Sequence, residues 1–426
     1  MLTRILHNSP KLCKFFNQLQ LKLSEPQMGH MLNIADALLV CEETKTLAAL
    51  QRQLVYTPDA SNMADFLRIS PWKANDVRAV LHKHQMQWLK KAAEQTGKDC
   101  KVFVNIDDSL GEKDKNTKHI EPVAWYHDHN ESSKKRPKYK NGFCFLVCTI
   151  RIGDYVATFD VRLYLREKTV RYINRSVPPE ERLRFQSKSS IAKQILADLK
   201  SLLSSGQVYV QFDSWYASKK LIKYAHRQGW RVTCALKRNR TLNKMKLSKH
   251  ELTIRHKWYN KVSVTTTDGS RTYYVRQLKG CLADIKEEVR VYFSKRHPRA
   301  KALSYILSTD IGCSAKEVLQ GYSWRWSVEV VNFYLKSSLG LSDFRVRSYE
   351  AVNKYMVVVH LAWAYIEQRY AEEGFKGKDK CYGDVIRQHK DEHAARWLSG
   401  AIDMAMSTGD KEKVLKLFLR LESEAV

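Results

Sequence analysis

The sequence predicts an α/β fold: a mixed five-stranded sheet with flanking helices, a β-rich insertion, and helical N- and C-terminal regions. Apolar residues recur at helical spacing before about residue 98 and after residue 350. Between these regions, short apolar strands alternate with helical segments, an order typical of a sheet packed between helices. The chain has 426 residues, which is too long for one compact core, so several domains are expected.

Residues 1–98 form the predicted N-terminal helical region. Apolar positions recur at helical spacing over Met28–Gln53 and Asp76–Ala93. Between them, Ser70-Pro71 indicates a turn between a short helix and the start of the next one. This spacing fits a helix-turn-helix that reads DNA, but it also fits a plain helical hairpin.

Residues 99–236 and 299–350 form the predicted sheet domain. Its first five strands are Val102–Ile106, Phe143–Ile152, Tyr155–Leu165, Val208–Phe212 and Trp230–Leu236. The second and third are joined across Gly153-Asp154, a two-residue turn that favours a hairpin. Helical segments precede the fourth and fifth strands, and this mixed order suits one sheet with helices on its faces.

Residues 237–298 form the predicted β-rich insertion, and residues 351–426 the helical C-terminal region. The insertion contains three short alternating strands interspersed with Lys and Arg: Val262–Thr267, Thr272–Gln277 and Val289–Phe293. Ser304–Thr309 returns to the strand pattern, and the chain is helical from Ala315 onward.

The charge balance points to nucleic acid. Lys and Arg total 73 against 45 acidic residues, for a net charge of +28. Such an excess is self-repelling unless a polyanion shares the surface. An RNA-associated structural protein or a merely basic enzyme stays open from composition alone. No apolar run reaches the roughly 18–20 residues of a membrane span, and nine scattered cysteines favour a reducing cytoplasm.

Two acids occupy strand ends, where catalytic groups gather in open α/β sheets. Asp107 follows the first strand and Asp213 follows the fourth. An Asp in this position is also a common turn residue or helix cap, so neither residue identifies a site alone.

A third acid lies on a predicted helix with an unusual stripe. Tyr322, Arg325, Glu329 and Lys336 stand at offsets 0, 3, 7 and 14, within about 60° of one another at roughly 100° per residue. The apolar residues of the same helix fall on another stripe: Trp324, Val328, Val331 and Leu335.

These residue types suit phosphoryl transfer by two metal ions. Carboxylates hold two Mg²⁺ ions roughly 3.5–4 Å apart around the scissile phosphate, and Mg²⁺ needs oxygen ligands only. Asp107, Asp213 and Glu329 are the candidate ligands, with Mn²⁺ as a substitute metal. Arg325 and Lys336 could hold phosphates on either side of the cut.

The spacing Tyr-x2-Arg-x3-Glu-x6-Lys from Tyr322 to Lys336 matches the Y-R-E-K signature of cut-and-paste DDE transposases from bacterial insertion sequences. Asp107-Asp-Ser109 and Asp213-Ser-Trp-Tyr-Ala-Ser218 resemble the motifs of their first and second catalytic Asp. The resemblance spans about residues 100–360. It implies an RNase H-like fold whose β-rich insertion lies between the last strand and the Glu-bearing helix.

One register question stays open. Asp107 and Asp108 are adjacent, and strand alternation points them to opposite faces, so only one can be the first ligand. The Asp-x-Ser match favours Asp107, with Asp108 as the alternative. Lys237, Arg238 and Arg240 are predicted to face DNA, and any of several tryptophans could stack on a flipped base.

The resemblance implies a bacterial, nucleoid-associated enzyme that binds terminal inverted repeats in double-stranded DNA and synapses two ends as a homodimer. Each end would be cut, the second strand through a hairpin, and the 3′-hydroxyls would be joined to target DNA. Two rivals stay open: an RNase H-like nuclease or resolvase without strand transfer, and a domesticated DNA-binding protein without catalysis.

Overall fold

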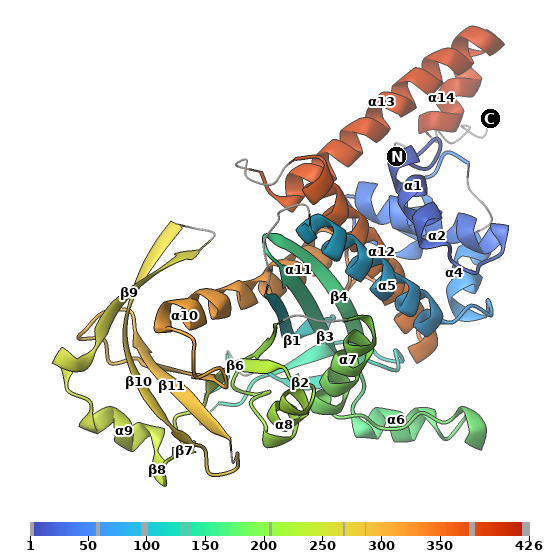
Figure 1. Cartoon of the computed structure of the whole chain (residues 1–426). Coiled ribbons are helices and arrows are strands. Elements are labelled where there is room, and N and C mark those ends of the chain that lie inside the picture. The colour runs from blue at the N-terminus through green and yellow to red at the C-terminus, as the bar shows by residue number, and fades with distance from the viewer. Residues whose placement is uncertain are drawn as a thin grey trace.

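In the described part of the chain, ten strands form one mixed sheet (Figure 1). The computed structural model describes residues 4–56, 60–94, 101–128, 131–133, 136–203, 207–266, 269–285, 287–374 and 380–419. The strands of the sheet are β1 (Val102–Glu112), β2 (Ala124–His127), β3 (Tyr139–Ile152), β4 (Tyr155–Tyr164), β5 (Val208–Phe212), β6 (Arg231–Leu236), β9 (Asn260–Thr266), β10 (Gly269–Cys281), β11 (Glu288–Lys295) and β12 (Ser304–Ser308).

The predicted five-stranded sheet is confirmed in the order β4-β3-β1-β5-β6. β4, β3 and β1 are antiparallel neighbours, and β5 and β6 run parallel to β1. The β3–β4 hairpin turns at Gly153, whose φ of 58° lies in the left-handed region that glycine adopts without a steric cost. This is the RNase H-like arrangement.

The β-rich insertion continues the same sheet. β12 pairs antiparallel with β6 from Tyr305 opposite Leu236, and β11, β10 and β9 follow in turn, each antiparallel to its neighbour. The two short strands β7 (Thr241–Leu242) and β8 (Met245–Lys246) form a separate small ladder. The boundaries of the four predicted domains stay a prediction.

β1 is longer than the sequence predicted. The expected strand ended at Ile106, whereas β1 runs to Glu112 and stays paired with β3 as far as Gly142. The reason is that β3 has 14 residues and supplies a partner along this whole length. The parallel pairing with β5 does end at Ile106, opposite Phe212.

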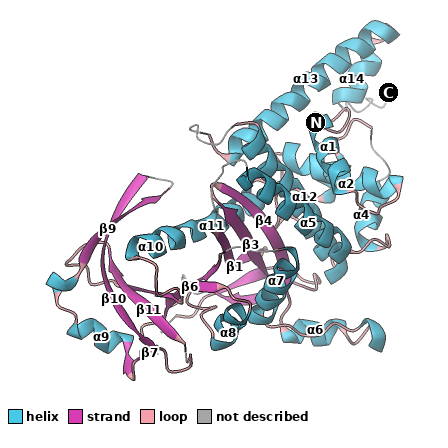
Figure 2. Cartoon of the chain, in the orientation of Figure 1, coloured by secondary structure: helices cyan, strands magenta, loops and turns pink. Residues whose placement is uncertain are grey.

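Helices cover both faces of the sheet and gather at the β4 side, away from the insertion (Figure 2). They are α1 (Pro10–Leu19), α2 (Glu25–Val40), α3 (Leu47–Gln51), α4 (Ala60–Arg68), α5 (Ala74–Glu94), α6 (Glu167–Ile173), α7 (Lys188–Leu202), α8 (Lys219–Arg227), α9 (Leu247–Thr253), α10 (Ala315–Ser323), α11 (Ser327–Ser337), α12 (Tyr349–Glu372), α13 (Tyr382–Thr408) and α14 (Lys411–Leu419). Short 3₁₀ turns are η1 (Pro179–Glu181), η2 (His256–Trp258) and η3 (Trp324–Trp326).

Side-chain alternation along β3 divides the core in two. Phe143 and Phe145 pack with α11, α12 and the N-terminal helices, whereas Leu146 and Ile150 pack with α7 and α8 on the other face. Most residues of α12 are buried, including the apolar run from Met356 to Ala362. Among the described residues, no helix has both the length and the apolar character to span a bilayer.

Candidate active site

Asp107 and Asp213 lie side by side on neighbouring strands. β1 and β5 are parallel, and their last paired residues are Ile106 and Phe212. Asp107 and Asp213 therefore occupy the next position on each strand. The Oδ1 atom of Asp213 accepts hydrogen bonds from the backbone N–H groups of Trp215, at 2.8 Å, and Tyr216, at 3.2 Å. This turn fixes the carboxylate at the edge of the sheet.

Asp108 has different neighbours from Asp107. Its Oδ2 forms an ion pair with Lys188 Nζ at 2.6 Å, and its Oδ1 accepts a hydrogen bond from the Tyr216 hydroxyl at 2.8 Å. Lys188 begins α7, on the face of the sheet opposite α11. Asp108 thus makes structural contacts on that face, and these contacts support Asp107 as the better candidate ligand.

The predicted continuous helix from Tyr322 to Lys336 is wrong. The chain runs from α10 through the 3₁₀ turn η3 into α11. Trp324 consequently leaves the expected apolar stripe: it packs against Phe103, with 4.7 Å between ring centres, whereas Val328 and its neighbours enter the main core. A 3₁₀ turn has three residues per turn rather than 3.6, so it changes the direction of every later side chain.

A buried polar network anchors the start of α11. Asn105 of β1 donates hydrogen bonds to the hydroxyls of Thr149, at 3.1 Å, and Ser327, at 3.3 Å. The two hydroxyls lie 2.7 Å apart. These contacts fix Ser327, and with it the preceding Arg325 and the following Glu329, against β1 and β3.

Arg325 joins two of the three candidate ligands. Its Nη1 lies 2.6 Å from Asp107 Oδ2 and 3.9 Å from Glu329 Oε1. Burial raises the pKa of Asp107 to about 7; the charge of Arg325 lowers it, and that of Asp213 raises it further. A buried carboxylate beside a second acid is a place where a cation binds favourably.

Tyr322 and Lys336 lie on either side of this centre. The Tyr322 hydroxyl donates to the carbonyl oxygen of Phe212 at 3.4 Å, directly before Asp213, and burial raises its pKa to about 12. Burial lowers the pKa of Lys336, whereas the charges of Glu112 and Glu329 raise it. Tyr322 is thus hydrogen-bonded directly before Asp213, whereas Lys336 Nζ lies 5.9 Å from the ring centre of Phe145 in β3.

The donor set fits Mg²⁺. Asp107, Asp213 and Glu329 supply carboxylate oxygens, which are the ligands that Mg²⁺ prefers. Their oxygens do not all lie within 4.8 Å of one another, so they do not form a site for one ion bound by all three. A centre with two ions spans a wider gap and needs no such convergence.

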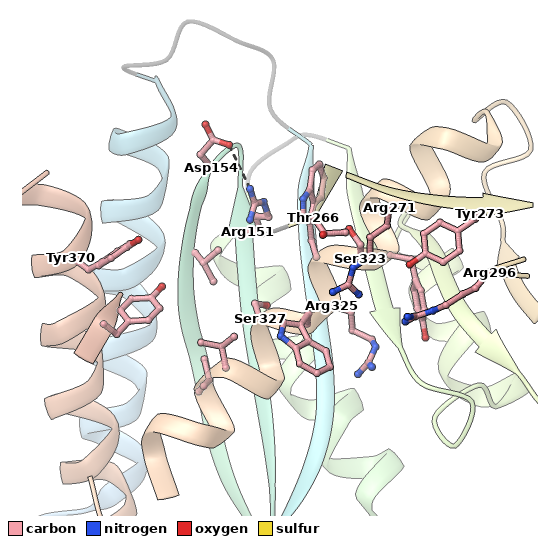
Figure 3. A pocket seen from close by; sticks show the side chains of 17 residues that line it. Arg151, Asp154, Thr266, Arg271, Tyr273, Arg296, Ser323, Arg325, Ser327 and Tyr370 are labelled. Atoms are coloured by element: carbon pink, nitrogen blue, oxygen red, sulfur yellow. Dashed lines mark hydrogen bonds and ion pairs between the residues drawn. The ribbon is translucent and has the colours of Figure 1, made fainter. Parts of the chain in front are cut away.

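A pocket of about 580 Å³ opens beside Tyr322 and Arg325 (Figure 3). Four arginines line it, each from a different element: Arg151, Arg271, Arg296 and Arg325. Aromatic rings line it as well: Tyr273, Tyr322, Trp324, Trp326, Tyr370 and Tyr382. Cations with aromatic rings are the usual lining of a site for single-stranded nucleic acid.

The three predicted basic residues after β6 have separate surroundings. Arg240 forms an ion pair with Asp284 at 3.0 Å within the insertion. Arg238 lines a second pocket, of about 510 Å³, together with Ser214, the residue after Asp213, and Lys301. Lys237 is exposed.

Two family models match the chain. A family model described as DDE superfamily endonuclease matches residues 14–250, which is more than half of the chain. The chain belongs to the DDE superfamily of endonucleases. A second model, described as a transposase DDE domain, matches residues 186–365. Together the matched segments of this DDE endonuclease include Asp107, Asp213 and Glu329.

A solved structure also resembles the DDE endonuclease at low similarity. It is a piggyBac transposase synaptic complex with hairpin DNA, 12% identical, with a TM-score of 0.42 over 97% of this chain and 82% of that chain. At this TM-score, the likeness supports no conclusion about the fold or the function of the chain. No curated protein sequence matches the chain significantly.

Sequence reasoning missed several residues of the DDE endonuclease site. Arg151 of β3, Arg271 of β10 and Arg296, directly after β11, line the pocket from segments far apart in the chain, and no local pattern brings them together. Asn105 did carry a signal, because a polar residue interrupts the apolar run Val102–Ile106. A buried amide of this kind needs partners, and these are Thr149 and Ser327.

Proposed function

We propose that this chain is a DNA transposase that cuts its element free and joins it to a new site. Its substrates would be the terminal inverted repeats of its own element and a target DNA, both double-stranded. The observation that carries the proposal is the pairing of Arg325 with both Asp107 and Glu329, next to Asp213 at the end of the neighbouring strand, in a chain matched by a transposase DDE domain model. Membership of the DDE superfamily gives the broader class, an endonuclease.

Asp107, Asp213 and Glu329 would hold two Mg²⁺ ions, with Mn²⁺ as a substitute. When bound, these ions would activate the attacking oxygen and stabilise the leaving oxygen of the phosphodiester. The protein supplies a rigid edge for them, because Asp107 lies within β1, Asp213 directly follows β5, and Glu329 lies in the first turn of α11. Asp108 is not proposed as a ligand, since Lys188 and Tyr216 hold its carboxylate.

Arg325, Tyr322 and Lys336 would grip phosphates at the cut. Arg325 Nη1 lies 2.6 Å from Asp107 Oδ2. With the carboxylates occupied by cations, its guanidinium would be able to bind a phosphate through two parallel hydrogen bonds. Lys336 lies about two turns of helix beyond Glu329 and would act as a point charge.

The pocket beside this centre suits a distorted DNA end. A hairpin intermediate bends the terminal nucleotides sharply, which exposes a base to stacking. Trp326 is 60% exposed and follows Arg325 directly. The arginines of the pocket would bind the phosphates that flank such a base. This arrangement supports cutting of the second strand through a hairpin.

The remaining partners are proposed from charge and chemistry. The net charge of +28 supports binding of a long DNA segment, and Lys237, Arg238 and Arg240 lie on the basic stretch after β6. The N-terminal helical region would contribute to end binding. Joining two ends requires two active centres, so we infer a homodimer in the synaptic complex, acting at the bacterial nucleoid.

Cleavage of labelled DNA that carries the element's ends tests the proposal. We expect the wild type with Mg²⁺ to yield 3′-hydroxyl ends, hairpins and joined products. Glu329→Gln should bind the same DNA and release none of these products. Glu180→Gln removes an exposed carboxylate of the 3₁₀ turn η1, which is not part of the candidate site. It serves as the matched control that retains cleavage.

Each rival predicts a different result. A nuclease or resolvase would cut with Mg²⁺ but never join the ends to target DNA. A domesticated DNA-binding protein would bind the ends and cut with neither Mg²⁺ nor Mn²⁺. Either result would contradict the transposase proposal.

A further inference from the structure

A buried carboxylate and two imidazoles meet where the N-terminal helices pack on the C-terminal helix α13. Asp36 lies on α2, and His389 and His393 lie one turn apart on α13. All three side chains are at most 1% exposed. Asp36 and the two histidines are separated by more than 350 residues, so this cluster joins the two ends of the fold.

Both imidazoles point at the same oxygen. The distance from Asp36 Oδ1 to His389 Nε2 is 2.7 Å, and that to His393 Nε2 is 2.8 Å. The other oxygen, Oδ2, accepts a hydrogen bond from the backbone N–H of Ser9 at 2.7 Å. Two histidines four residues apart on a helix present their Nε2 atoms on one side, which is a common arrangement for metal ligands.

The negative charge of Asp36 has no lysine or arginine partner within 4.0 Å among the described residues. Arg369, whose charge acts on His389, belongs to a cluster that is already balanced. Lys11 and Arg369 both pair with Glu373 and Glu392, at distances of 2.6–2.9 Å. A fully buried carboxylate without a counter-charge is costly, so a proton on one histidine or a metal ion must supply the positive charge.

A second buried cluster shows the contrast. Asp160 also lies near a histidine, His82, at 3.2 Å. However, Arg162 at 2.7 Å and Arg78 at 3.2 Å neutralise the Asp160 carboxylate. Two guanidinium groups would repel a divalent cation there. The Asp36 cluster has no comparable arginine contact, which leaves it the better of the two for a cation.

We propose that Asp36, His389 and His393 bind a zinc-type divalent cation that fastens α13 to the N-terminal helices. Two imidazole nitrogens and one carboxylate oxygen are ligands suited to zinc. The three ligand atoms lie within 4.8 Å of one another, so small side-chain shifts bring each to the 2.0–2.2 Å that zinc requires. This site is separate from the catalytic carboxylates and does not rest on the proposed function.

The surroundings of the cluster fit zinc in two further respects. His389 Nδ1 lies 3.2 Å from the Tyr365 hydroxyl, whose oxygen also accepts a hydrogen bond from Arg369 Nη1 at 3.3 Å. Such a partner on the far nitrogen orients a metal-bound imidazole. Cys13 lies in the first turn of α1, and its N–H donates at 2.8 Å to the carbonyl oxygen of Ser9, the residue whose own N–H binds Asp36. It is our candidate for the fourth ligand.

Zinc titration of chelator-treated full-length protein tests this proposal. The protein would carry Asp107→Asn and Glu329→Gln, so that the catalytic carboxylates bind no zinc. We expect saturable binding of about one zinc ion per chain and a higher melting temperature with zinc than without it. Asp36→Asn and His393→Gln should lose both effects. His84→Gln, which changes a half-buried histidine paired with Gln368, is the matched control that retains them.

Cobalt binding provides a readout that does not depend on the folding of the ligand variants. In the same zinc-free protein, Co²⁺ should give the intense visible bands of a tetrahedral site. Cys13→Ser should abolish the near-ultraviolet cobalt–thiolate band while the visible bands persist. Absence of zinc binding and of the tetrahedral cobalt spectrum would overturn the proposal in favour of a protonated histidine. Unchanged zinc binding in folded His393→Gln would also overturn it.

Discussion

Asp107 and Asp108 are neighbours in β1 with opposite electrostatic surroundings. Lys188 lies 2.6 Å from Asp108 and provides its counter-charge on the α7 face. Asp107 shares Arg325 with Glu329, and burial raises its pKa to about 7. Strand alternation creates this difference between adjacent residues, so a single step in register would exchange a structural acid for a catalytic one.

Glu367 gives a residue-scale prediction about pH. This side chain of α12 is buried, and burial raises its pKa to about 8. It accepts hydrogen bonds from the backbone N–H and the hydroxyl of Thr158, at 2.8 and 2.7 Å. The folded state therefore keeps the proton that the unfolded state releases above its ordinary pKa of 4.5. Stability falls as pH rises between these two pKa values.

Glu367→Gln removes this dependence, because the amide mimics the protonated acid. The free energy of unfolding of the variant minus that of the wild type should increase with pH from 5 to 8, by at most about 1.4 kcal/mol per pH unit. Chemical denaturation at several pH values measures it. A difference that stays constant over this range would contradict the assignment.

At the scale of elements, α10 links the insertion to the catalytic edge. The Gln320 side-chain amide pairs with the backbone of Thr265 in β9: its Oε1 accepts from the N–H at 2.7 Å, and its Nε2 donates to the carbonyl at 2.5 Å. The next residues of α10 and η3 include Tyr322 and Arg325. The Gln320 side chain is thus one of the contacts that couple the position of the insertion to the site.

Gln320→Leu should loosen this contact without unfolding the chain. Both hydrogen bonds are exposed, so we expect a loss in stability of at most about 1 kcal/mol. Hydrogen exchange of the β9 amides should speed up, and that of β5 should not change. The measurement is hydrogen–deuterium exchange by mass spectrometry. Identical exchange rates of the β9 amides in the variant and the wild type would exclude the coupling.

The elements also show how far the sequence predicts the fold. The strands of the central sheet were predictable because each is a short apolar run bounded by turn residues. Asp107 and Asp213 were found because each directly follows one of these apolar runs in the sequence. The helix after Ala315 was predicted as continuous, since the pattern from Tyr322 to Lys336 fits an α-helix. The 3₁₀ turn at Trp324–Trp326 depends on packing of Trp324 against Phe103, which is a tertiary contact.

The candidate site was predictable in its carboxylates and not in its pocket. Asp107, Asp213 and Glu329 each belong to a local pattern, a strand end or a helix stripe, and the resemblance to the Y-R-E-K signature brought the three together as candidates. Arg151, on the other hand, reaches the pocket from the β3–β4 hairpin and stacks its guanidinium 4.7 Å from the ring centre of Trp324. Contacts between distant segments such as this one leave no local signature.

At the scale of the whole molecule, the positive charge should govern DNA affinity. Binding to phosphates releases counterions, so the logarithm of the association constant falls linearly with the logarithm of salt concentration. The double variant Arg271→Gln, Arg296→Gln removes two pocket cations. We expect its salt slope to be shallower by about one to two.

Titration of element-end DNA at several salt concentrations measures this slope. Arg387→Gln is the matched control, because Arg387 is exposed on α13 and pairs with Asp384. It should leave the slope close to that of the wild type. An unchanged slope for the double variant would place the pocket outside the DNA-binding surface.

One of the two cores that flank the sheet joins the N-terminal helices to the helices around the site. Residues of the N-terminal helices, β3, β4, α11 and α12 belong to a single buried cluster. The sheet edge that carries Asp107 is therefore held from behind by both ends of the chain. A metal-binding edge benefits from such rigidity, because its ligands must keep their positions during the reaction.

The most direct test of the catalytic claim is a change of metal preference. In Asp107→Cys, a thiolate replaces the carboxylate, and thiolates bind Mg²⁺ poorly but softer divalent metals better. We predict that this variant does not cleave element-end DNA with Mg²⁺ and recovers part of its activity with Mn²⁺. Asp108→Cys should show no such switch. Cleavage by Asp107→Cys with Mg²⁺, or a switch seen in Asp108→Cys instead, would contradict the assignment of Asp107 as a metal ligand.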